Sequence, residues 1–572
     1  MSERTLLTAL ARRTTPLHLW QGRDQVSTWS ASTLREAAAR WAQALQAHGA
    51  GPGRVVATSA ATSLELVAVI LGTWQCRAAI VVLPEANPDD VAGLRRVSDG
   101  LDQLQPVVML AGGTLPSDLR AVVPAVFSLA DGPPASDSTA TMAADAGDLE
   151  APALMQLTSG STGRAKVVPI SHRMLAANCE ATASRLGVAP DDHILSWLPL
   201  THDMGFGGAL CQALLSDLEL TLLPTALFAQ SPLNFLHAMS QQRATLSPSP
   251  PSAYALLARL GRRAAREGIN LAQWRFAWAG AAPVFAHVLR AFEISMQPLG
   301  LRPGVLQPAY GMAEAVVAVS FAPAGRPWRS LALHGRALRE QGVVLLQEAA
   351  AEANDDVIEL VSNGTPLDGM QVQARDEAGH PLPPGRLGTL WIHGHSVVPG
   401  YLHHEEPQRF ASGWCDTGDL GFLWEGEVYV TGRVKDIIAR GGVKVGAHEI
   451  EAAAEAALDL RPGRVAAFAH LDHAQGRETV VVVIARRFDK EESAMQRRVA
   501  EAVLSRCAVA IDACVFTAAG PLPRTTSGKL QRGLVRDYWL GGGYADAERV
   551  SAACASAPRR AEASGNESIS TT

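Results

Sequence analysis

The segment Leu157–Lys166, with the sequence LTSGSTGRAK, combines residue types that can bind phosphate. Hydroxyl groups offer hydrogen-bond donors, glycines allow close approach of the backbone, and basic side chains supply positive charge. The residues are Thr158, Ser159, Gly160, Ser161, Thr162, Gly163, Arg164 and Lys166. Their order is GxxGxxK, whereas a Walker loop requires GxxxxGK followed by serine or threonine. The segment therefore predicts a phosphate-binding loop of another kind, with a serine- and glycine-rich surface turn as the alternative.

Four later segments contribute side chains that a nucleotide-binding enzyme could use. They are PAYGMAEA (308–315), WCDTGDLGFL, GRVKD and PLPRTTSGKLQR. Their chemically useful residues are an aromatic ring, two carboxylates and three cations: Tyr310, Glu314, Asp419, Arg433, Lys435 and Lys529. Each one alone could be a core residue, a turn residue or a solvated charge. Their occurrence together, downstream of the phosphate-binding loop, favours nucleotide chemistry.

The composition argues against a nucleic-acid-binding protein and against a disulfide-stabilised one. The 572 residues carry a formal net charge of −6, and the seven cysteines are scattered without a CxxC pair. This cysteine usage favours a reducing compartment and disfavours a zinc site of the cysteine type. The amino terminus lacks the apolar core of a secretory signal, and charges interrupt the most hydrophobic stretch, Leu64–Pro84. We therefore expect a soluble, cytoplasmic protein without a membrane span.

The spacing of apolar residues predicts alternating helices and strands. Helices are expected over 34–51 and 63–74, and strands over 54–61 and 78–84, which indicates a parallel α/β sheet. A further helix over 172–186 should begin after the N-cap Ser171 and end at Gly187. After Gly432 the pattern changes to that of a compact α+β segment, and residues after about 541 lose their aliphatic side chains.

The ordered motifs TSGSTGRAK, YGMAEA, TGDLGF, GRVKDII and PRTTSGK resemble those of the adenylate-forming superfamily, across roughly residues 25–540. This superfamily contains acyl-CoA synthetases, peptide-synthetase adenylation domains and luciferases. The resemblance implies a large multi-layer N-terminal α/β domain over residues 1–432, which binds ATP and the acyl group. It also implies a small α+β domain over 433–540 that rotates about a hinge at Lys435. The loss of aliphatic side chains predicts a disordered tail over 541–572.

Three segments narrow the resemblance to the fatty acyl-AMP ligases. They are SWLPLTHDMGFGG (196–208), WRFAWAGAAPV (274–284) and YGMAEAVVAVS. Residues 331–364 also look like the insertion that separates these ligases from CoA-forming relatives. In that family the insertion restricts domain rotation, so the adenylate passes to a phosphopantetheine carrier protein. The segment IIARGGVKVGAHEIE departs from this subgroup and is closer to the general superfamily, so CoA stays an alternative acceptor.

The resemblance implies that ATP and Mg²⁺ take part and gives each motif residue a role. Glu314 would hold Mg²⁺, and the catalytic Lys529 would contact the carboxylate and the α-phosphate. Tyr310 would stack on adenine, and Asp419 and Arg433 would bind the ribose. The ATP- and AMP-binding set is Thr158, Ser159, Gly160, Ser161, Thr162, Gly163, Lys166, Gly280, Ala281, Ala282, Tyr310, Gly311, Met312, Asp419 and Arg433.

An acyl pocket is expected at the segment that contains HDMG. Its candidate residues are Trp197, His202, Met204, Gly205, Phe206 and Met312. His202 and Asp203 are read as structural and not as a catalytic pair, because no activated serine or cysteine accompanies them. The local motifs leave the acid open.

We therefore expect an ATP-dependent ligase that forms an acyl-AMP and transfers the acyl group to a phosphopantetheinylated carrier protein supplied in trans. The alternatives are an acyl-CoA synthetase, an amino-acid adenylation enzyme that loads a carrier, and an inactive nucleotide-binding scaffold. The four residues Glu314, Asp419, Arg433 and Lys529 disfavour the scaffold, since an inactive protein would not need them all.

Overall fold

A computed structural model describes most of the chain. The described residues are 6–86, 91–134, 148–158, 165–347, 356–440, 443–461, 463–472, 477–486, 492–517, 522–524 and 530–542. Residues 159–164 of the predicted phosphate-binding loop, Lys529 and most of the predicted tail lie outside these ranges. The chain divides into two compact units. One comprises Met1–Lys435 with Arg524–Lys529, and the other comprises Asp436–Pro523 with Leu530–Thr572.

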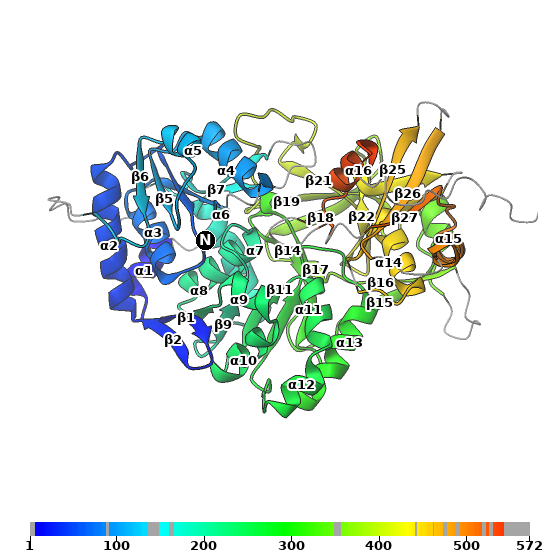
Figure 1. Ribbon diagram of the computed structural model, residues 1–572, viewed down its shortest axis with the longest axis horizontal. Coiled ribbons are helices and arrows are strands. Elements are labelled where there is room, and N and C mark those ends of the chain that lie inside the picture. Colours follow the sequence, from blue (N-terminus) through cyan, green and yellow to red (C-terminus); the bar gives the residue numbers. More distant parts are fainter. Residues whose placement is uncertain are drawn as a thin grey trace, which may run out of the picture. The chain divides into compact units, whose positions relative to one another are not determined.

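The first unit contains a six-stranded sheet with the order β6-β5-β3-β4-β7-β8. Its strands are β3 (Val55–Ser59), β4 (Ala79–Leu83), β5 (Val108–Ala111), β6 (Ala125–Ser128), β7 (Pro152–Leu157) and β8 (Val167–Ser171). Neighbouring strands run parallel except β7 and β8, which form an antiparallel pair. Helices α2 (Ala31–Ala47) and α3 (Leu64–Gln75) pack on each other beside this sheet (Figure 1). The helices, strands and parallel pairing predicted for residues 34–84 are thus confirmed, and the first helix begins three residues earlier, at Ala31.

A nine-stranded sheet has the order β17-β14-β13-β12-β11-β9-β10-β1-β2. Its strands are β1 (Leu17–Gly22), β2 (Gln25–Trp29), β9 (His193–Ser196), β10 (Glu219–Leu222), β11 (Leu246–Ser249), β12 (Phe276–Ala279), β13 (Leu306–Gly311), β14 (Ala318–Phe321) and β17 (Thr365–Pro366). The run from β13 to β1 is parallel, and the outer pairs are antiparallel. The sheet therefore joins strand β1 to strands about 200 residues later in the chain.

Helix α6 (His172–Leu186) connects strand β8 of the six-stranded sheet to strand β9 of the nine-stranded sheet, and it has the predicted ends. The Ser171 hydroxyl accepts a hydrogen bond from the backbone N–H of Met174 at 3.2 Å. Gly187 ends the helix with φ = +55°. A side chain at this left-handed position would be strained, which is why glycine suits it.

The first unit contains further described helical segments, most of them short. They are α1 (Leu6–Arg12), α4 (Val91–Leu104), α5 (Ser117–Ala121), α7 (Asp203–Gly205), η1 (Phe206–Cys211), α8 (Gln212–Leu215), α9 (Thr225–Gln230), α10 (Leu233–Gln241), α11 (Pro251–Ala258), α12 (Gly261–Arg266), α13 (Ala286–Met296), η2 (Gln297–Leu299), η3 (Ala313–Ala315) and η4 (Ala337–Gln341). The short turn η5 (Val434–Asp436) begins in the first unit and ends at the first residue of the second. None of the helices that the structure describes is long and apolar enough to span a bilayer.

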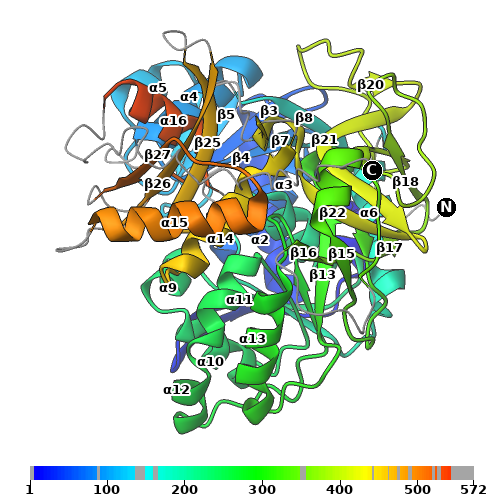
Figure 2. The same cartoon turned by 90° about the vertical axis from the view of Figure 1, so that its right-hand side faces the viewer.

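A third sheet of the first unit is built from β18 (Met370–Arg375), β19 (Gly388–Gly394), β20 (Phe410–Ala411), β21 (Trp414–Trp424) and β22 (Glu427–Arg433). Strands β15 (Ser330–His334) and β16 (Val357–Val361) of the insertion-like segment form a separate antiparallel pair. Strand β16 lies beside β22 (Figure 2). Leu333 and Leu338 share a buried cluster with Phe422 and Tyr429, so the segment packs on the β21–β22 hairpin.

The second unit is a small α+β structure. Its elements are β23 (Ile437–Arg440), β24 (Val443–Gly446), α14 (Ala447–Ala457), β25 (Val465–Asp472), β26 (Arg477–Ile484), α15 (Glu492–Cys507), β27 (Ala513–Phe516) and α16 (Arg532–Leu540). Helices α14 and α15 pack together against the sheet β25-β26-β27. The Arg532 guanidinium ties α16 to this unit, because it donates to both Glu451 oxygens at 2.7 Å and to Asp436 at 2.9 Å.

Candidate functional site

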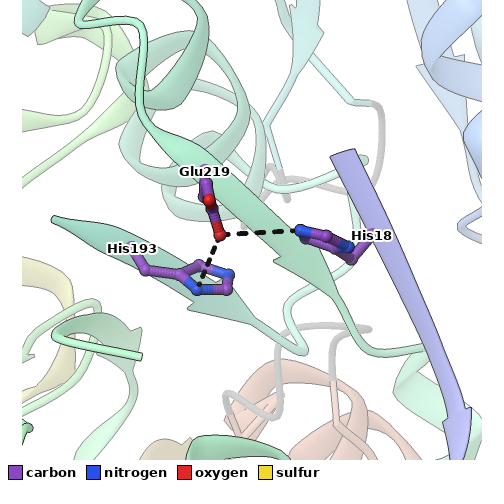
Figure 3. Close-up of side chains that lie close together, drawn as sticks. All are labelled: His18, His193 and Glu219. Atoms are coloured by element: carbon purple, nitrogen blue, oxygen red, sulfur yellow. Dashed lines mark ion pairs between the residues drawn. The ribbon is translucent and has the colours of Figure 1, made fainter. Parts of the chain in front are cut away.

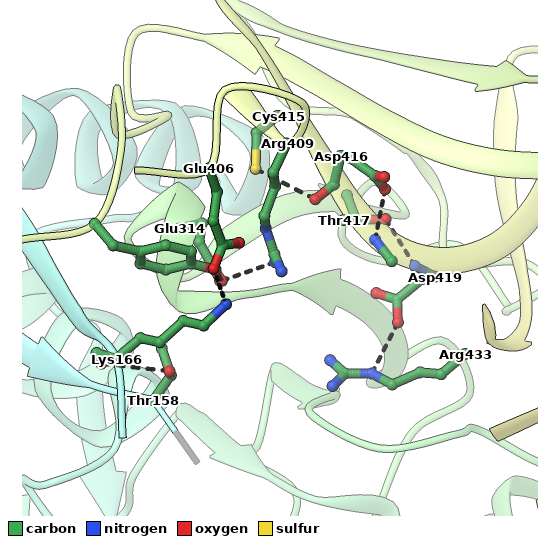
Figure 4. A network of polar contacts seen from close by, with 12 residues as sticks. Thr158, Lys166, Glu314, Glu406, Arg409, Cys415, Asp416, Thr417, Asp419 and Arg433 are labelled. Carbon is green, nitrogen blue, oxygen red and sulfur yellow. Dashed lines mark hydrogen bonds and ion pairs between the residues drawn. The ribbon is translucent and has the colours of Figure 1, made fainter. Parts of the chain in front are cut away.

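Asp419 is the centre of a hydrogen-bonded group made by residues of three separate motifs. It lies directly opposite Arg433 in the antiparallel β21–β22 hairpin. The Arg433 Nε donates to Asp419 Oδ1 at 2.9 Å (Figure 4), and the Tyr310 hydroxyl donates to Asp419 Oδ2 at 2.8 Å. Burial and the Asp419 charge raise the pKa of Tyr310 well above its ordinary value. The phenol therefore stays a donor, and the two oxygens of Asp419 are held in one orientation.

The local sequence TGD explains how Asp419 is presented. Gly418 has φ = +70°, which residues with a side chain rarely adopt. The Thr417 hydroxyl accepts from the backbone N–H of Asp419 at 3.0 Å and donates to the carbonyl of Leu390 at 2.7 Å. The Asp416 carboxylate accepts from the Gly418 N–H at 2.8 Å. The motif is thus a rigid turn that directs one carboxylate toward Tyr310.

Glu314 forms a second polar group, on the short turn η3 that follows β13. Its side chain is buried, and its Oε1 accepts from the Arg409 Nη2 at 2.9 Å and from the Tyr401 hydroxyl. Burial, followed by the Glu314 charge, raises the pKa of Tyr401, so this phenol also remains protonated. The Arg409 guanidinium lies 5.4 Å from the centre of the Tyr401 ring. Arg409 therefore supplies the positive charge that a buried carboxylate requires.

The backbone after Glu314 is strained. Val316 has φ = +70° and ψ = −64°, and the N–H of Val317 donates to the carbonyl of Ala315 at 2.9 Å. These values describe a γ-turn, which is costly for a β-branched residue. A Cβ on Gly311 would lie 1.8 Å from the Val317 carbonyl oxygen, so only glycine fits there. The YGMAEAVV motif therefore encodes a tight backbone crossing, and such strain is concentrated at functional sites.

Lys166 and Thr158 lie at the two ends of the predicted phosphate-binding loop. The Thr158 N–H donates to the Lys166 carbonyl at 2.9 Å, next to the last pair of the β7–β8 ladder, Leu157 and Val167. The Lys166 ammonium forms an ion pair with Glu406 and lies 4.8 Å from the centre of the Tyr401 ring (Figure 4). The loop thus connects two antiparallel strands, and its cation lies near the Glu314 group.

A cavity lies next to these groups. It encloses about 540 Å³ of space, including the open solvent at its mouth. Its lining contains Asn178, Cys179, Thr182, Asp203, Met204, Gly207, Gly208, Gln212, Trp278, Gly280, Ala281, Ala309, Tyr310, Gly311, Val317, Ala318 and Phe321. The structure therefore brings predicted nucleotide residues, such as Tyr310 and Gly280, to the same cavity as Met204 of the predicted acyl pocket.

Several predicted residues lie outside this lining. Trp197 stacks on Phe228 at 3.7 Å between ring centroids, and its indole N–H donates to Ser249 at 2.9 Å. His202 caps α7, because its Nδ1 accepts from the Met204 N–H at 3.2 Å. Of the described residues predicted for the site, the lining contains Met204, Gly280, Ala281, Tyr310 and Gly311, and it lacks Thr158, Lys166, Trp197, His202, Gly205, Phe206, Ala282, Met312, Glu314, Asp419, Arg433 and Lys435. Their predicted roles remain predictions.

The sequence reading missed residues that complete these groups. Arg409, Tyr401 and Glu406 come from a segment without a recognisable motif, and their sequence offered no signal. Gly207 and Gly208, in the π-helical turn η1, line the cavity, and they directly follow the HDMGF segment. That run of two glycines was a usable signal, since small residues next to a pocket motif leave space for a ligand.

The structure describes the predicted hinge residue Lys435 but not the predicted catalytic residue Lys529. Lys435 lies in the short helical turn η5 at the end of the first unit. Lys529 and residues 159–164 lie outside the described residues.

The structure brings together six residues that the sequence had indicated. They are Thr158, Lys166, Glu314, Tyr310, Asp419 and Arg433.

The chemistry of the Glu314 group is compatible with Mg²⁺. Tyr401 and Arg409 both donate to Oε1 of its carboxylate, which leaves Oε2 for an ion. Mg²⁺ is commonly bound by one or two carboxylates together with waters and substrate phosphates. A single carboxylate beside the end of a phosphate-binding loop fits that requirement.

Comparisons with known proteins agree with this geometry. The family described as AMP-binding enzyme matches residues 9–402, and the AMP domain of the Disco-interacting protein 2-like family matches residues 468–548. The medium-chain-fatty-acid–[acyl-carrier-protein] ligase JamA of Moorena producens is 31% identical over 404 residues, which cover 68% of each protein. The 4-hydroxyphenylalkanoate adenylyltransferase of Mycobacterium marinum is 28% identical over 541 residues, which cover 89% of this chain and 85% of that enzyme.

Solved structures give the same answer. A structure from a study of fatty acyl-adenylate ligases from E. coli and L. pneumophila matches with a TM-score of 0.84 at 29% identity. The match covers 95% of this chain and 98% of that one. It confirms the predicted fold class, with a large N-terminal α/β part and a smaller C-terminal part. The chain therefore belongs to the AMP-binding enzyme family and is an adenylate-forming ligase.

Proposed function

We propose that this protein activates a fatty or related carboxylic acid with ATP and then transfers the acyl group to the phosphopantetheine thiol of a carrier protein. The observation that carries the proposal is the convergence of Tyr310, Asp419 and Arg433 from separate motifs in one hydrogen-bonded group, with Tyr310 in the lining of the cavity. The name of the relative JamA, an acyl-carrier-protein ligase for medium-chain fatty acids, supports both the acid and the acceptor.

In the proposed nucleotide site, Tyr310 and the backbone of Gly280–Ala282 hold the adenine. Tyr310, Gly280 and Ala281 line the cavity, and the Tyr310 ring is held in place by the hydrogen bond to Asp419. An ionised carboxylate has about four acceptor positions. Two are used by Tyr310 and Arg433, so Asp419 keeps capacity to accept from the ribose hydroxyls, and Arg433 lies beside that position.

In the proposed first step, a carboxylate oxygen of the acid attacks the α-phosphorus of ATP. A new O–P bond forms as the bond to the bridging oxygen breaks, and pyrophosphate leaves with the bonding electrons. The charge that develops must be stabilised by donors already in place. The loop from Thr158 to Lys166 binds the leaving pyrophosphate, and Lys529 contacts the α-phosphate. Mg²⁺ at Glu314 neutralises phosphate charge when bound.

In the proposed second step, the pantetheine sulfur attacks the acyl carbon, AMP leaves with the bonding electrons, and the thiol proton is released to solvent. The insertion-like segment 331–364 supports a carrier as acceptor. It packs on the β21–β22 hairpin, and β22 ends at Arg433, two residues before the proposed hinge. Arg329, just before this segment, also forms an ion pair with Glu425 at 2.9 Å in the same hairpin. A segment anchored there is well placed to limit movement at Lys435.

Lys435→Pro tests the proposed hinge, because proline fixes φ near −65°. We expect adenylation to persist and acyl transfer to fall. Equal losses in both steps, or in neither, would count against the hinge.

The proposed reaction is tested by measuring pyrophosphate release with fatty acids of graded length, aryl acids and amino acids. The best acid is then offered to CoA and to a panel of holo carrier proteins, and the thioester is detected by mass spectrometry. Adenylation followed by carrier loading, without CoA thioester, is the expected result. Efficient formation of acyl-CoA would make the protein an acyl-CoA synthetase, the function that the GGVKV segment (441–445) favours. Preference for an amino acid would change the substrate class, and no release with any acid would refute the proposal.

A further inference from the structure

Two histidines and a glutamate meet on one face of the nine-stranded sheet, on strands β1, β10 and β9 (Figure 3). Glu219 of β10 lies opposite His193 of β9. His18 of β1 lies opposite Thr221, two residues beyond Glu219 on the same strand. Paired residues, and residues two apart on a strand, share a face of a sheet. The parallel register alone therefore gathers His18, His193, Glu219 and Thr221 on one face.

Hydroxyl groups hold both imidazole rings from behind. The Nδ1 of His18 lies 2.9 Å from the hydroxyl oxygen of Thr28 on β2, and the Nε2 of His193 lies 2.8 Å from that of Thr221. When these ring nitrogens donate to the hydroxyl oxygens, the other nitrogens carry their lone pairs toward Glu219. Metal-binding histidines are oriented in this way, because the N–H that does not face the ion is hydrogen-bonded to a second group.

The distances match bonds to a shared ion better than direct hydrogen bonds. His18 Nε2 lies 3.6 Å and His193 Nδ1 lies 3.5 Å from the same oxygen, Glu219 Oε2. Hydrogen bonds from N–H to oxygen are ordinarily no longer than about 3.2 Å. Bonds of about 2.1 Å to a tetrahedral zinc ion separate two ligand atoms by about 3.4 Å. All three ligand atoms lie within 4.8 Å of one another.

We propose that His18, His193 and Glu219 bind one divalent transition-metal ion of the zinc class. Two imidazoles with one carboxylate form a ligand set that zinc accepts, with a fourth position open to water. The Glu219 side chain is 47% exposed, whereas those of His18 and His193 are 14% and 8% exposed. An ion can therefore reach the carboxylate from solvent, and the buried rings form the floor of the site.

A bound ion would link strands that are far apart in the sequence. The ion joins β1, near the amino terminus, to β9 and β10, which are formed about 200 residues later. An ion that binds only the folded state stabilises it in proportion to its occupancy. Metal binding at this site therefore clamps the N-terminal strands β1 and β2 onto the sheet. The clamp is independent of the nucleotide site, because its residues belong to neither the Tyr310 group nor the Glu314 group.

The test is zinc titration of the chelator-treated full-length protein by calorimetry, with the melting temperature followed in parallel. We expect one zinc ion per chain and a higher melting temperature. Glu219→Gln and His18→Gln should each weaken zinc binding by at least about tenfold. Thr221→Val removes only the orienting hydroxyl and should weaken binding by about 10- to 100-fold.

A matched control is the pair His237 and Glu267, whose Nε2 and Oε2 lie 2.9 Å apart, a normal hydrogen bond, with Arg23 in place of a second histidine. Glu267→Gln should leave zinc affinity unchanged. The proposal is overturned if the wild-type protein binds no zinc. It is also overturned if zinc affinity is the same in wild type, Glu219→Gln and His18→Gln, because the ion is then bound elsewhere.

Discussion

Asp419 and Arg433 lie directly opposite each other in the β21–β22 hairpin, with Nε and Oδ1 separated by 2.9 Å. The hairpin thus pairs two motifs that are separated by 13 residues of sequence. The carboxylate is buried and is also held by Tyr310, whereas 46% of the Arg433 side chain is exposed. The pair therefore presents an oriented carboxylate whose charge is balanced by a partly exposed guanidinium.

Asp419→Asn should weaken ATP binding. The amide keeps the shape of the side chain and can still accept from Tyr310, but it loses the charge that attracts Arg433 and the ribose hydroxyls. A hydrogen bond that involves a charged group contributes about 1.5–3 kcal/mol, so the KM for ATP should rise about 10- to 100-fold. Steady-state pyrophosphate release measures this change. Asp416→Asn is the control, since an amide oxygen there can still accept from the Gly418 N–H; a similar rise in that variant would count against a special role for Asp419.

Lys529→Ala should impair the adenylation step selectively. A preorganised donor at the reacting phosphate typically contributes a factor of about 10²–10³ to the rate. We therefore expect ATP–pyrophosphate exchange to fall by about that factor, whereas transfer from supplied acyl-adenylate continues. Exchange near the wild-type rate would remove Lys529 from the proposed mechanism.

Gly207→Leu should shorten the space available to the acid. A Cβ at this position would meet Val317 at 3.5 Å, an ordinary contact, and the rest of a leucine side chain would extend into the cavity. The ratio of pyrophosphate release with long acids to that with short acids should fall at least about tenfold, the loss expected when about two methylenes cannot be buried. Gly207→Ala should change this ratio little. An unchanged ratio in the leucine variant, with intact ATP binding, would show that the acyl group does not bind beside Gly207.

His172 should make the protein sensitive to acid. Burial lowers the pKa of His172 from 6.5 to about 4, and its ring packs edge-on against Trp74. As the pH falls below 6.5, the unfolded chain binds a proton that the folded state accepts only near pH 4. The free energy of unfolding therefore decreases from pH 6.5 to 4, and the contribution of this residue is fully present above 6.5.

His172→Phe should remove that share of the loss, which is on the order of 3 kcal/mol over the whole interval. Denaturant unfolding at several pH values between 7 and 4 measures it, as the difference between variant and wild type. His404→Gln, at an exposed position, is the control and should follow the wild-type curve. Parallel curves for His172→Phe and wild type would show that the pKa of His172 is the same in the folded and the unfolded state.

Local patterns were sufficient where local physics decides the structure. Ser171 and Gly187 were predicted as the ends of one helix, because a side-chain cap and a left-handed glycine are properties of a few consecutive residues. The alternation over residues 34–84 predicted parallel strands, since buried strands and amphipathic helices have distinct periods. The ordered motifs indicated the family, and the comparisons confirmed it.

Contacts between segments that are distant in the sequence could not be predicted from local patterns. Arg409 and Tyr401 belong to no motif, yet they provide the charge and the hydrogen bond that hold Glu314. Trp197 belongs to a pocket motif, yet it stacks on Phe228 away from the cavity lining. Partners of this kind depend on which segments pack side by side, and a pattern read along the chain contains no such information.

The sequence by itself determined the helices and strands, the order of the motifs and therefore the class of enzyme. Only the tertiary structure decided which carboxylate meets which cation, and it brought His18, His193 and Glu219 to one face of a sheet. The physical reason is that secondary structure follows from the conformational preferences and apolar periods of neighbouring residues. The register between strands is set by how the whole core packs, and a shift of one residue would place these side chains on opposite faces.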